Sequence, residues 1–412
     1  MRIKYLPRHL FAVMLLLSLR ASAADPTANG RIERIESLRV LRVWGTPREM
    51  GFAHGRLLGA ALVRLLNEVL SRSGEKGRRE YEEFRSQVGE VVRLPTAARE
   101  EIEGIFEGVK AADGSLPQVD AVQRPLTLED LIVHNAADLI RAFGGSFGCS
   151  GFTVWGARAG EAGVITARNF DFEAFRGMVE AQLVLVRQPA AAGRHAVATI
   201  TWPGYIGAFT GINDAGVCTF MHDGTGERLR TPEDKYTPMA LVLTELLETS
   251  AAGDAHERAA TLLKKATPYP FSYLVRVATP RVGGKVEPPE RVFRVDALGL
   301  SENPARDAMC ITTNHYLSAA FEPAANAGSW SRERYSRLQK RLDQAVTSHA
   351  AWEALASVAS GSDGGGTLHS VVIYPELRRL ELALAGWDDG LVPAPKRAPL
   401  ALEFKQLFAK PE

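Results

Sequence analysis

The sequence predicts an α+β protein with a helical N-terminal part and a strand-rich C-terminal part. From residue 47 to 138 apolar residues recur mostly at helical spacing, whereas after Gly148 short apolar or alternating runs follow one another. A chain of 412 residues that is 46% hydrophobic and 24% charged is typical of a globular protein with a large core. The composition excludes fibrous and disordered classes, and the net charge of +1 does not indicate a nucleic-acid partner.

The first 23 residues have the pattern of a secretory signal peptide. Basic residues precede an apolar run at residues 10–19, and Ala21 and Ala23 form an A-x-A cleavage site. The run is shorter than the roughly 20 residues that a membrane-spanning helix needs. We therefore expect a periplasmic or secreted protein that is cleaved near Ala23 and has no stable membrane anchor.

The N-terminal part is expected to contain one strand and three helices. The strand covers residues 31–43, and helical spacing of apolar residues marks one helix from Pro47 and a second around residues 102–109. A third helix is expected to begin at Thr127, because Asp130 three residues later completes a capping box.

The C-terminal part is expected to contain a series of strands interrupted by helices. The expected strands are residues 163–167, 181–186, 196–201, 216–221, 291–295 and 309–313. The expected helices are residues 238–249, 255–265, 332–345 and 350–358, and residues 368–374 pair with 379–384 in a closing hairpin. Helices that flank a long antiparallel strand set indicate a layered architecture.

Cys149 lies at the boundary between the two parts. The sequence has two other cysteines, Cys218 and Cys310, which are either core residues or a disulfide, so at least one thiol is left over. Glycine has no side chain to obstruct attack by the thiol on its carbonyl, so the Gly148–Cys149 bond is a candidate for self-cleavage. Cleavage would place an α-amine, with a reference pKa of about 7.7–8, beside the thiol as a general base.

A strand ending in Arg168-Asn169-Phe170-Asp171 would pair with the strand that begins at Cys149. Such a hairpin would bring Arg168 and Asp171 beside the thiol. An arginine lowers the pKa of a thiol, and a carboxylate can orient an amine. An ordinary ion pair at the end of a strand is the alternative interpretation.

These motifs resemble a known family. Gly148-Cys149-Ser150, followed by the sequence ARNFDF at residues 167–172, is similar to the N-terminal-nucleophile hydrolases with an N-terminal cysteine. More narrowly, the sequence resembles the C45 group, typified by acyl-coenzyme A:6-aminopenicillanic acid acyltransferase, with choloylglycine hydrolase and acid ceramidase as relatives. Further similar blocks are residues 45–55, 101–108, 128–131, 202–204, 211–217, 312–315 and 334–338.

The resemblance implies a four-layer αββα fold, no metal and no organic cofactor. It also implies self-cleavage between Gly148 and Cys149 into an α chain of residues 24–148 and a β chain of residues 149–412, which stay associated. Cys149 would act as the nucleophile in cleavage and in turnover. Arg168 and Asp171 would hold the thiol and the new amine.

The resemblance also assigns three residues farther along the chain. Asn314 matches an asparagine whose amide helps to form the oxyanion hole. Arg334 matches an arginine that supports the nucleophile region, with Arg332 as the competing assignment. His222 stands where bile salt hydrolases have an oxyanion asparagine, and its ring would donate instead, in a way that depends on pH below neutrality.

The substrate is expected to be a small N-acyl or amide compound. Trp155, Trp202 and Tyr205 either line an apolar acyl pocket or belong to the core. The histidines lack HExxH-like spacing, so we expect no zinc site. Hydrolysis is favoured for an exported protein because acyl-coenzyme A donors are cytosolic. The alternatives are acyl transfer to an amine, a non-catalytic binding module matured by cleavage, and a papain-like protease.

Overall fold

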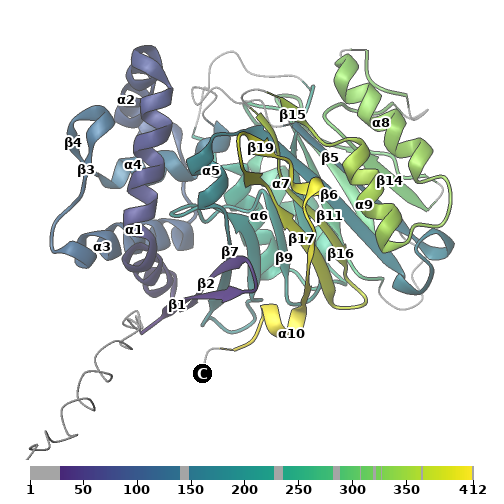
Figure 1. Cartoon of the computed structure of the whole chain (residues 1–412), viewed down its shortest axis with the longest axis horizontal. Helices are drawn as coiled ribbons and strands as arrows, with labels where there is room; N and C mark the ends of the chain where they lie inside the picture. The colour runs from purple at the N-terminus through teal and green to yellow at the C-terminus, as the bar shows by residue number, and fades with distance from the viewer. Residues whose placement is uncertain are drawn as a thin grey trace, which may run out of the picture.

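The computed structural model describes residues 28–139, 148–226, 235–281, 288–306, 308–318, 322–325, 327–362 and 365–410. The expected signal peptide and residues 144–147 before Gly148 lie outside the described residues. Two large sheets pack face to face, and helices lie on both outer sides of the pair (Figure 1). Within the described ranges, no helix has the length and hydropathy needed to cross a bilayer.

The N-terminal part begins with a hairpin and not with the single expected strand. β1 (Gly30–Ile35) and β2 (Leu38–Gly45) are antiparallel, and the chain reverses at Glu36, whose φ is +52°. β2 then pairs in parallel with β7 (Leu183–Pro189). The segment before Cys149 therefore contributes two strands to a sheet that is otherwise formed by the C-terminal part.

Four helices follow this hairpin. They are α1 (Pro47–Arg72), α2 (Gly74–Val91), α3 (Thr96–Asp113) and α4 (Leu128–Asn135). The expected capping box at the start of α4 is confirmed, because Thr127 and Asp130 bond reciprocally. Thr46 and Glu49 form a second capping box at the start of α1.

The sequence blocks at residues 45–55 and 101–108 lie where α1 and α3 cross closely. Glycines of α1 lie on the backbone of α3, where a Cβ on Gly51 or Gly55 would be 2.0 Å from a carbonyl oxygen. The reverse holds for Gly104 and Gly108 of α3, at 2.3 and 2.1 Å from carbonyl oxygens of α1. Any larger residue would force the two helices apart.

The first sheet has nine strands in the order β1-β2-β7-β8-β9-β10-β11-β12-β13. Its remaining strands are β8 (Val197–Thr201), β9 (Thr210–Asn213), β10 (Cys218–Asp223), β11 (Tyr273–Ala278), β12 (Glu290–Asp296) and β13 (Gly299–Asn303). Side chains alternate between two cores: Leu183 and Leu185 pack with the helices, whereas Val184 and Val186 face the second sheet. α6 (Met239–Thr249) and α7 (Ala255–Ala266) lie on the helical side.

The second sheet has seven strands. They are β14 (Met309–Thr312), β5 (Gly148–Trp155), β6 (Val164–Glu173), β16 (Gly365–Tyr374), β17 (Arg379–Leu384) and β20 (Leu400–Glu403) in that order, with β15 (Gly361–Ser362) beside β16. α8 (Ser329–Arg341) and α9 (Ser348–Ser357) cover its outer face (Figure 1). The α+β, four-layer αββα prediction is confirmed.

The remaining short elements lie around these layers. They are β3 (Gln118–Val119), β4 (Arg124–Pro125), α5 (Arg176–Ala181), β18 (Gly386–Trp387), β19 (Leu391–Val392) and α10 (Phe404–Leu407).

Candidate active site

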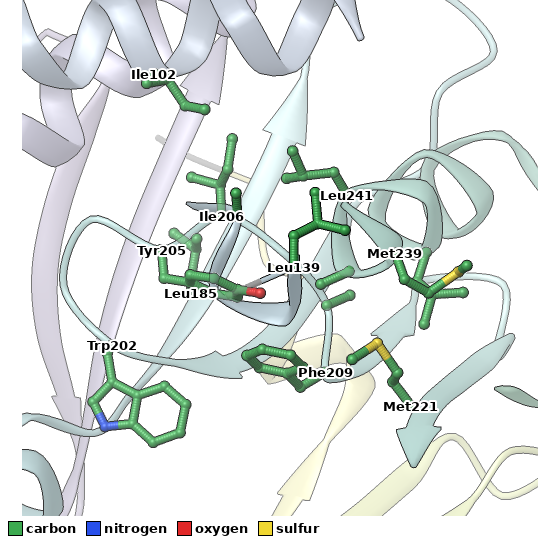
Figure 2. Packing of buried hydrophobic residues seen from close by; sticks show 14 of the residues in the cluster. Ile102, Leu139, Leu185, Trp202, Tyr205, Ile206, Phe209, Met221, Met239 and Leu241 are labelled. Atoms are coloured by element: carbon green, nitrogen blue, oxygen red, sulfur yellow. The ribbon is translucent and has the colours of Figure 1, made fainter. Parts of the chain in front are cut away.

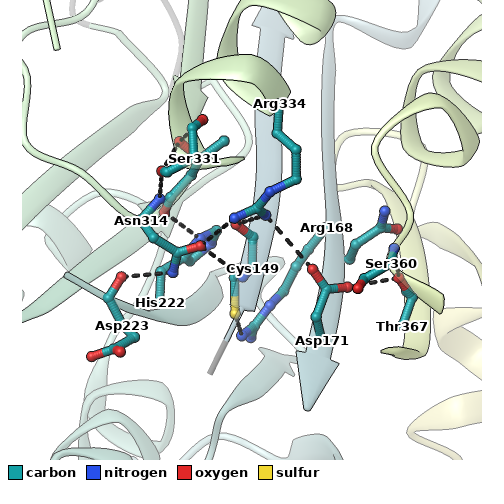
Figure 3. Close-up of polar contacts among 12 residues, drawn as sticks. Cys149, Arg168, Asp171, His222, Asp223, Asn314, Ser331, Arg334, Ser360 and Thr367 are labelled. Atoms are coloured by element: carbon teal, nitrogen blue, oxygen red, sulfur yellow. Dashed lines mark hydrogen bonds and ion pairs between the residues drawn. The ribbon is translucent and has the colours of Figure 1, made fainter. Parts of the chain in front are cut away.

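The β5–β6 hairpin places Cys149 beside Arg168. Its register pairs Cys149 with Phe170 and Gly151 with Arg168, so these side chains share the face between the two sheets. The Cys149 thiol is fully buried, and Arg168 Nη2 lies 2.9 Å from its Sγ (Figure 3). Burial raises the pKa of the Cys149 thiol, and the positive charge of Arg168 opposes that rise.

The guanidinium of Arg168 is held by acceptors from the first sheet. Nη1 donates to the Phe209 carbonyl and, at 2.6 Å, to Thr210 Oγ1, and Nη2 donates to the Met221 carbonyl at 2.5 Å. Cys149 Sγ is itself 3.7 Å from the Met221 carbonyl oxygen. The thiol and the cation beside it therefore lie where β5, β6, β9 and β10 meet.

His369 supports this arrangement from β16. Its Nε2 is 2.8 Å from Thr210 Oγ1, and its ring stacks on Phe170 with the centroids 4.8 Å apart. Arg168 donates to the same Thr210 oxygen, so this hydroxyl links the imidazole to the guanidinium. Burial lowers the pKa of His369, which keeps the ring neutral. The sequence offered no signal for these hydrogen bonds, which connect His369 through Thr210 to Arg168.

The backbone of Cys149 is bound on both sides. Its N–H donates to Asn314 Oδ1 at 3.1 Å, and its carbonyl accepts from Arg334 Nη1 at 2.5 Å. Arg334 Nη2 also donates to Asn314 Oδ1 at 2.6 Å, which fixes the amide orientation because an arginine has only donors. Asn314 Nδ2 donates one proton to the Asp223 carbonyl at 2.7 Å (Figure 3).

The structure distinguishes between the two candidate arginines of α8. Arg334 is buried and contacts Cys149 and Asn314, whereas Arg332 is exposed. Of the two arginines that the sequence offered for this position, Arg334 is therefore the one that contacts the nucleophile region.

Asp171 lies near the Gly148–Cys149 peptide bond, on the face of β6 opposite to that of Arg168. It is opposite Gly148 in the register, with Arg334 Nη1 3.6 Å from its Oδ2 and Thr367 Oγ1 donating to its Oδ1 at 2.6 Å. Burial raises the pKa of Asp171 to about 6, although the charge of Arg334 opposes the rise. Arg168 and Asp171 thus approach the nucleophile region from opposite faces of one strand.

The structure does not support the donor role expected for His222. Its Nδ1 is 3.1 Å from the Thr313 carbonyl, which can only accept, so the ring proton is on Nδ1. Burial and the charges of Arg168 and Arg276 keep the pKa of His222 well below its ordinary value. The neutral ring therefore presents Nε2 as an acceptor, and protonation near neutrality is not expected.

The three aromatic residues have different positions. Trp155 lies at the far end of β5 and packs with Leu274 and Val292, so it is remote from Cys149. Trp202 and Tyr205 belong to the main core, with the Trp202 ring 6.0 Å from that of Phe170 and Tyr205 stacked on Phe209 at 4.9 Å (Figure 2). In this arrangement they are packing residues near the site.

The other thiols are separate from the site. Cys218 and Cys310 are buried and unpaired, so they form no disulfide. Across the described part of the chain, no group of three or more histidine, cysteine, aspartate and glutamate residues is arranged to hold a metal ion.

Comparisons with known proteins find similar solved structures at low sequence identity. No protein-family model and no curated protein matches the sequence. Among solved structures, the chain is similar to an N-acylethanolamine-hydrolyzing acid amidase ortholog from Caenorhabditis elegans, at 12% identity and a TM-score of 0.40 over 62% of this chain and 100% of that one.

Two further structures have comparable scores. A conjugated bile acid hydrolase from Clostridium perfringens is 11% identical over 62% of this chain and 92% of its own, with a TM-score of 0.42. A penicillin V acylase from Agrobacterium tumefaciens is 14% identical over 57% of this chain and 83% of its own, with a TM-score of 0.33.

Proposed function

We propose that the protein is an exported, self-processing N-terminal-nucleophile amidohydrolase of the C45 kind, in which Cys149 cleaves N-acyl compounds through a thioester. The observation that carries this proposal is the 2.9 Å contact between Arg168 Nη2 and Cys149 Sγ, next to a Gly148–Cys149 bond whose cysteine backbone is bound by Asn314 and Arg334. A buried thiol with a fixed cation beside it suits a nucleophile better than a packing residue.

Self-cleavage would begin with transfer of the acyl group that ends in Gly148 from the nitrogen of Cys149 to its sulfur. Cys149 Sγ attacks the Gly148 carbonyl carbon, the S–C bond forms and the C–N bond breaks, and the thiol proton ends on the departing Cys149 nitrogen. Water then hydrolyses the thioester, which gives the Gly148 carboxylate and restores the thiol. Asn314 Oδ1, which accepts from the Cys149 N–H in the intact chain, would then hold the new α-amine.

Turnover would repeat this chemistry on a substrate amide. The α-amine takes the thiol proton, the thiolate attacks the substrate carbonyl, and the protonated amine donates to the leaving nitrogen. The side-chain amide of Asn314, whose Nδ2 donates to the Asp223 carbonyl beside the nucleophile region, is our candidate donor to the oxyanion. Arg168 would stabilise the thiolate, and Asp171 and Arg334 would position the cysteine backbone.

The two chains would remain together after cleavage. The α chain, residues 24–148, includes β1 and β2, and β2 pairs with β7 of the β chain, residues 149–412. Asp138 caps the start of α6 through the Met239 N–H at 2.5 Å, and Asn135 bonds Gly204 and Ile206. Separation would break these hydrogen bonds, each worth about 0.5–1.5 kcal/mol net, and would expose the apolar core that the two chains share.

The test is intact mass and N-terminal sequencing of the wild-type protein and of Cys149→Ala. We expect wild type to yield a β chain that begins at Cys149 and an α chain that begins near Ala24, with Cys149→Ala uncut. Cys218→Ala and Cys310→Ala are matched controls and should be processed like wild type. A single wild-type chain, or normal processing of Cys149→Ala, would overturn the mechanism. An uncut chain would favour a thiol hydrolase that uses a side-chain base, and processing of Cys149→Ala would favour the binding module.

A further inference from the structure

Trp330 is an exposed aromatic residue at the candidate site that the chemistry above does not use. It is the second residue of α8, and 46% of its surface is exposed. The guanidinium carbon of Arg334 lies 3.4 Å from the centre of its ring. Because Arg334 also donates to the Cys149 carbonyl, the ring is fixed directly beside the bond to be cleaved.

The same ring closes one side of the α-carbon of Gly148. A Cβ placed on Gly148 would lie 2.6 Å from Cη2 of Trp330 and 3.1 Å from Cβ of Asp171. Contacts this short require the neighbours to move. Trp330 is held by Arg334 and Asp171 by Thr367, so neither can yield without losing a contact.

The position of Gly148 indicates where a substrate acyl group must lie. In self-cleavage the thioester joins Cys149 Sγ to the acyl group that ends in Gly148, and in turnover it joins the same sulfur to the substrate acyl group. Both species have the same bonds at sulfur and at the carbonyl carbon. The α-carbon of the substrate acyl group therefore takes the place of the Gly148 α-carbon.

We propose that Trp330 is a specificity-determining residue that forms one wall of the acyl subsite and excludes acyl groups that carry a branch on that side of the α-carbon next to the carbonyl. Straight-chain acyl and arylacetyl groups have no such branch, whereas acyl groups with a methyl or an amino group on the walled side of the α-carbon do. This inference rests on the proposed function, since it requires a thioester on Cys149. The exposed part of the indole would support the rest of the acyl chain at the entrance.

Self-processing provides the first test, as a double-mutant cycle. Gly148→Ala should slow cleavage by about 10- to 200-fold, the usual effect of one excess methyl group in a shaped pocket. In a Trp330→Ala background the same substitution should slow cleavage by about 3-fold or less. Trp352→Ala is the matched background, because Trp352 lies on α9 and bonds Glu381 at 2.6 Å; there the full Gly148→Ala effect should persist.

Turnover provides the second test, with 4-nitrophenyl hexanoate and the two enantiomers of 4-nitrophenyl 2-methylhexanoate. Acylation of Cys149 is followed by nitrophenol release and by the mass of the β chain, with Cys149→Ala as the background. Wild type should acylate at least one enantiomer about 10-fold or more slowly than hexanoate, and Trp330→Ala should reduce this ratio to about 3 or less. Trp330→Phe, which keeps a ring, should retain much of the discrimination.

The outcomes separate the two proposals. One outcome is that wild type is processed and acylated by hexanoate while Trp330→Ala changes neither the effect of Gly148→Ala on cleavage nor the rate ratio of hexanoate to 2-methylhexanoate. In that case Trp330 does not form a wall of the acyl subsite, and the proposed function stands. If wild type is neither cut at Cys149 nor acylated, the proposed function fails and the acyl subsite fails with it.

Discussion

Arg168 and Cys149 are joined by a contact of 2.9 Å between a guanidinium nitrogen and a buried sulfur. The guanidinium is also bound by the Phe209 and Met221 carbonyls and the Thr210 hydroxyl, all from the opposite sheet. Its position relative to the sulfur is thus set by the packing of the two sheets. A cation fixed in this way stabilises a thiolate in a site where burial alone would raise the thiol pKa.

The first prediction concerns this cation. Arg168→Met should reduce the rate of self-processing by about 100-fold or more, because the thiolate loses its neighbouring charge. Arg168→Lys keeps the charge but cannot bridge the same acceptors, so its rate should be intermediate and its pH profile displaced to higher pH. A time course of chain cleavage from pH 5 to 10 measures both effects.

Arg332→Met is the control for this experiment, since Arg332 is exposed on α8. It should be processed at the wild-type rate. An Arg168→Met protein that folds and is cleaved as fast as wild type would contradict the assigned role of Arg168.

The second prediction concerns Asp171 and pH. Burial raises the pKa of Asp171 from 3.8 to about 6, so the folded protein binds its proton more tightly than the unfolded chain does. The stability that this proton provides is present below about pH 4 and is lost as the pH rises through about 6. The total is roughly 3 kcal/mol at most, from 1.36 kcal/mol per pKa unit.

Asp171→Asn should therefore reduce the loss of folding stability between pH 4 and 7, because its amide does not ionise. Urea unfolding at pH 4, 5, 6 and 7, with both proteins in an uncut Cys149→Ala background, measures the slope. The difference in slope between the two proteins is the quantity that counts, because Asp138, whose pKa burial also raises to about 6, and the buried histidines contribute equally to both. Asp388→Asn, at an exposed position, should leave the slope unchanged; an unchanged slope in Asp171→Asn would contradict the prediction.

Sequence patterns predicted the layers and much of the site for identifiable reasons. Helical spacing and the capping box at Thr127 are local signals, and the adjacent β5–β6 hairpin brought Arg168 near Cys149 as expected. β11, which carries the fully buried Arg276, was not predicted. The partner of Arg276 is Glu290 on the neighbouring strand, and that pairing is visible only once the sheet is formed.

The unpredicted parts of the site depend on contacts between distant segments. Thr210, Thr367 and His369 carry no motif, and they reach Arg168 or Asp171 only through the packing of separate strands. The tautomer of His222 likewise depends on a carbonyl 91 residues away along the chain. Residue type and spacing do not encode such relationships.

The third prediction concerns the crossing of α1 and α3. Gly104→Ala would place a Cβ 2.3 Å from the Arg48 carbonyl oxygen, so we expect it to lower the free energy of unfolding by about 1–3 kcal/mol. Gly89→Ala, in α2, meets no atom within 4 Å and should raise that free energy by roughly 0.5–1 kcal/mol through helix propensity. Opposite signs in urea unfolding are expected; a stabilising Gly104→Ala would contradict the close crossing.

The fourth prediction concerns the connection between the two chains. Arg187 of β7 lies between Glu101 of α3 and Glu248 of α6, with Nε 3.0 Å from Glu101 Oε1 and Nη1 2.5 Å from Glu248 Oε1. All three side chains are buried, and Glu101 belongs to the segment before the proposed cleavage site. Removing Glu101 leaves Arg187 paired with Glu248 but takes away its hydrogen bonds to a charged carboxylate, which costs about 1.5–3 kcal/mol.

Glu101→Ala should accordingly weaken the association of the processed chains by about that amount. Urea titration followed by native size-exclusion chromatography measures the concentration at which the α chain separates. Glu103→Ala is the matched control on the same helix: its partner, Arg48, is 3.7 Å away and largely exposed, so the effect should be 1 kcal/mol or less, typical of surface pairs. If the chains of Glu101→Ala and Glu103→Ala separate at the same urea concentration, the buried pair does not hold the chains together.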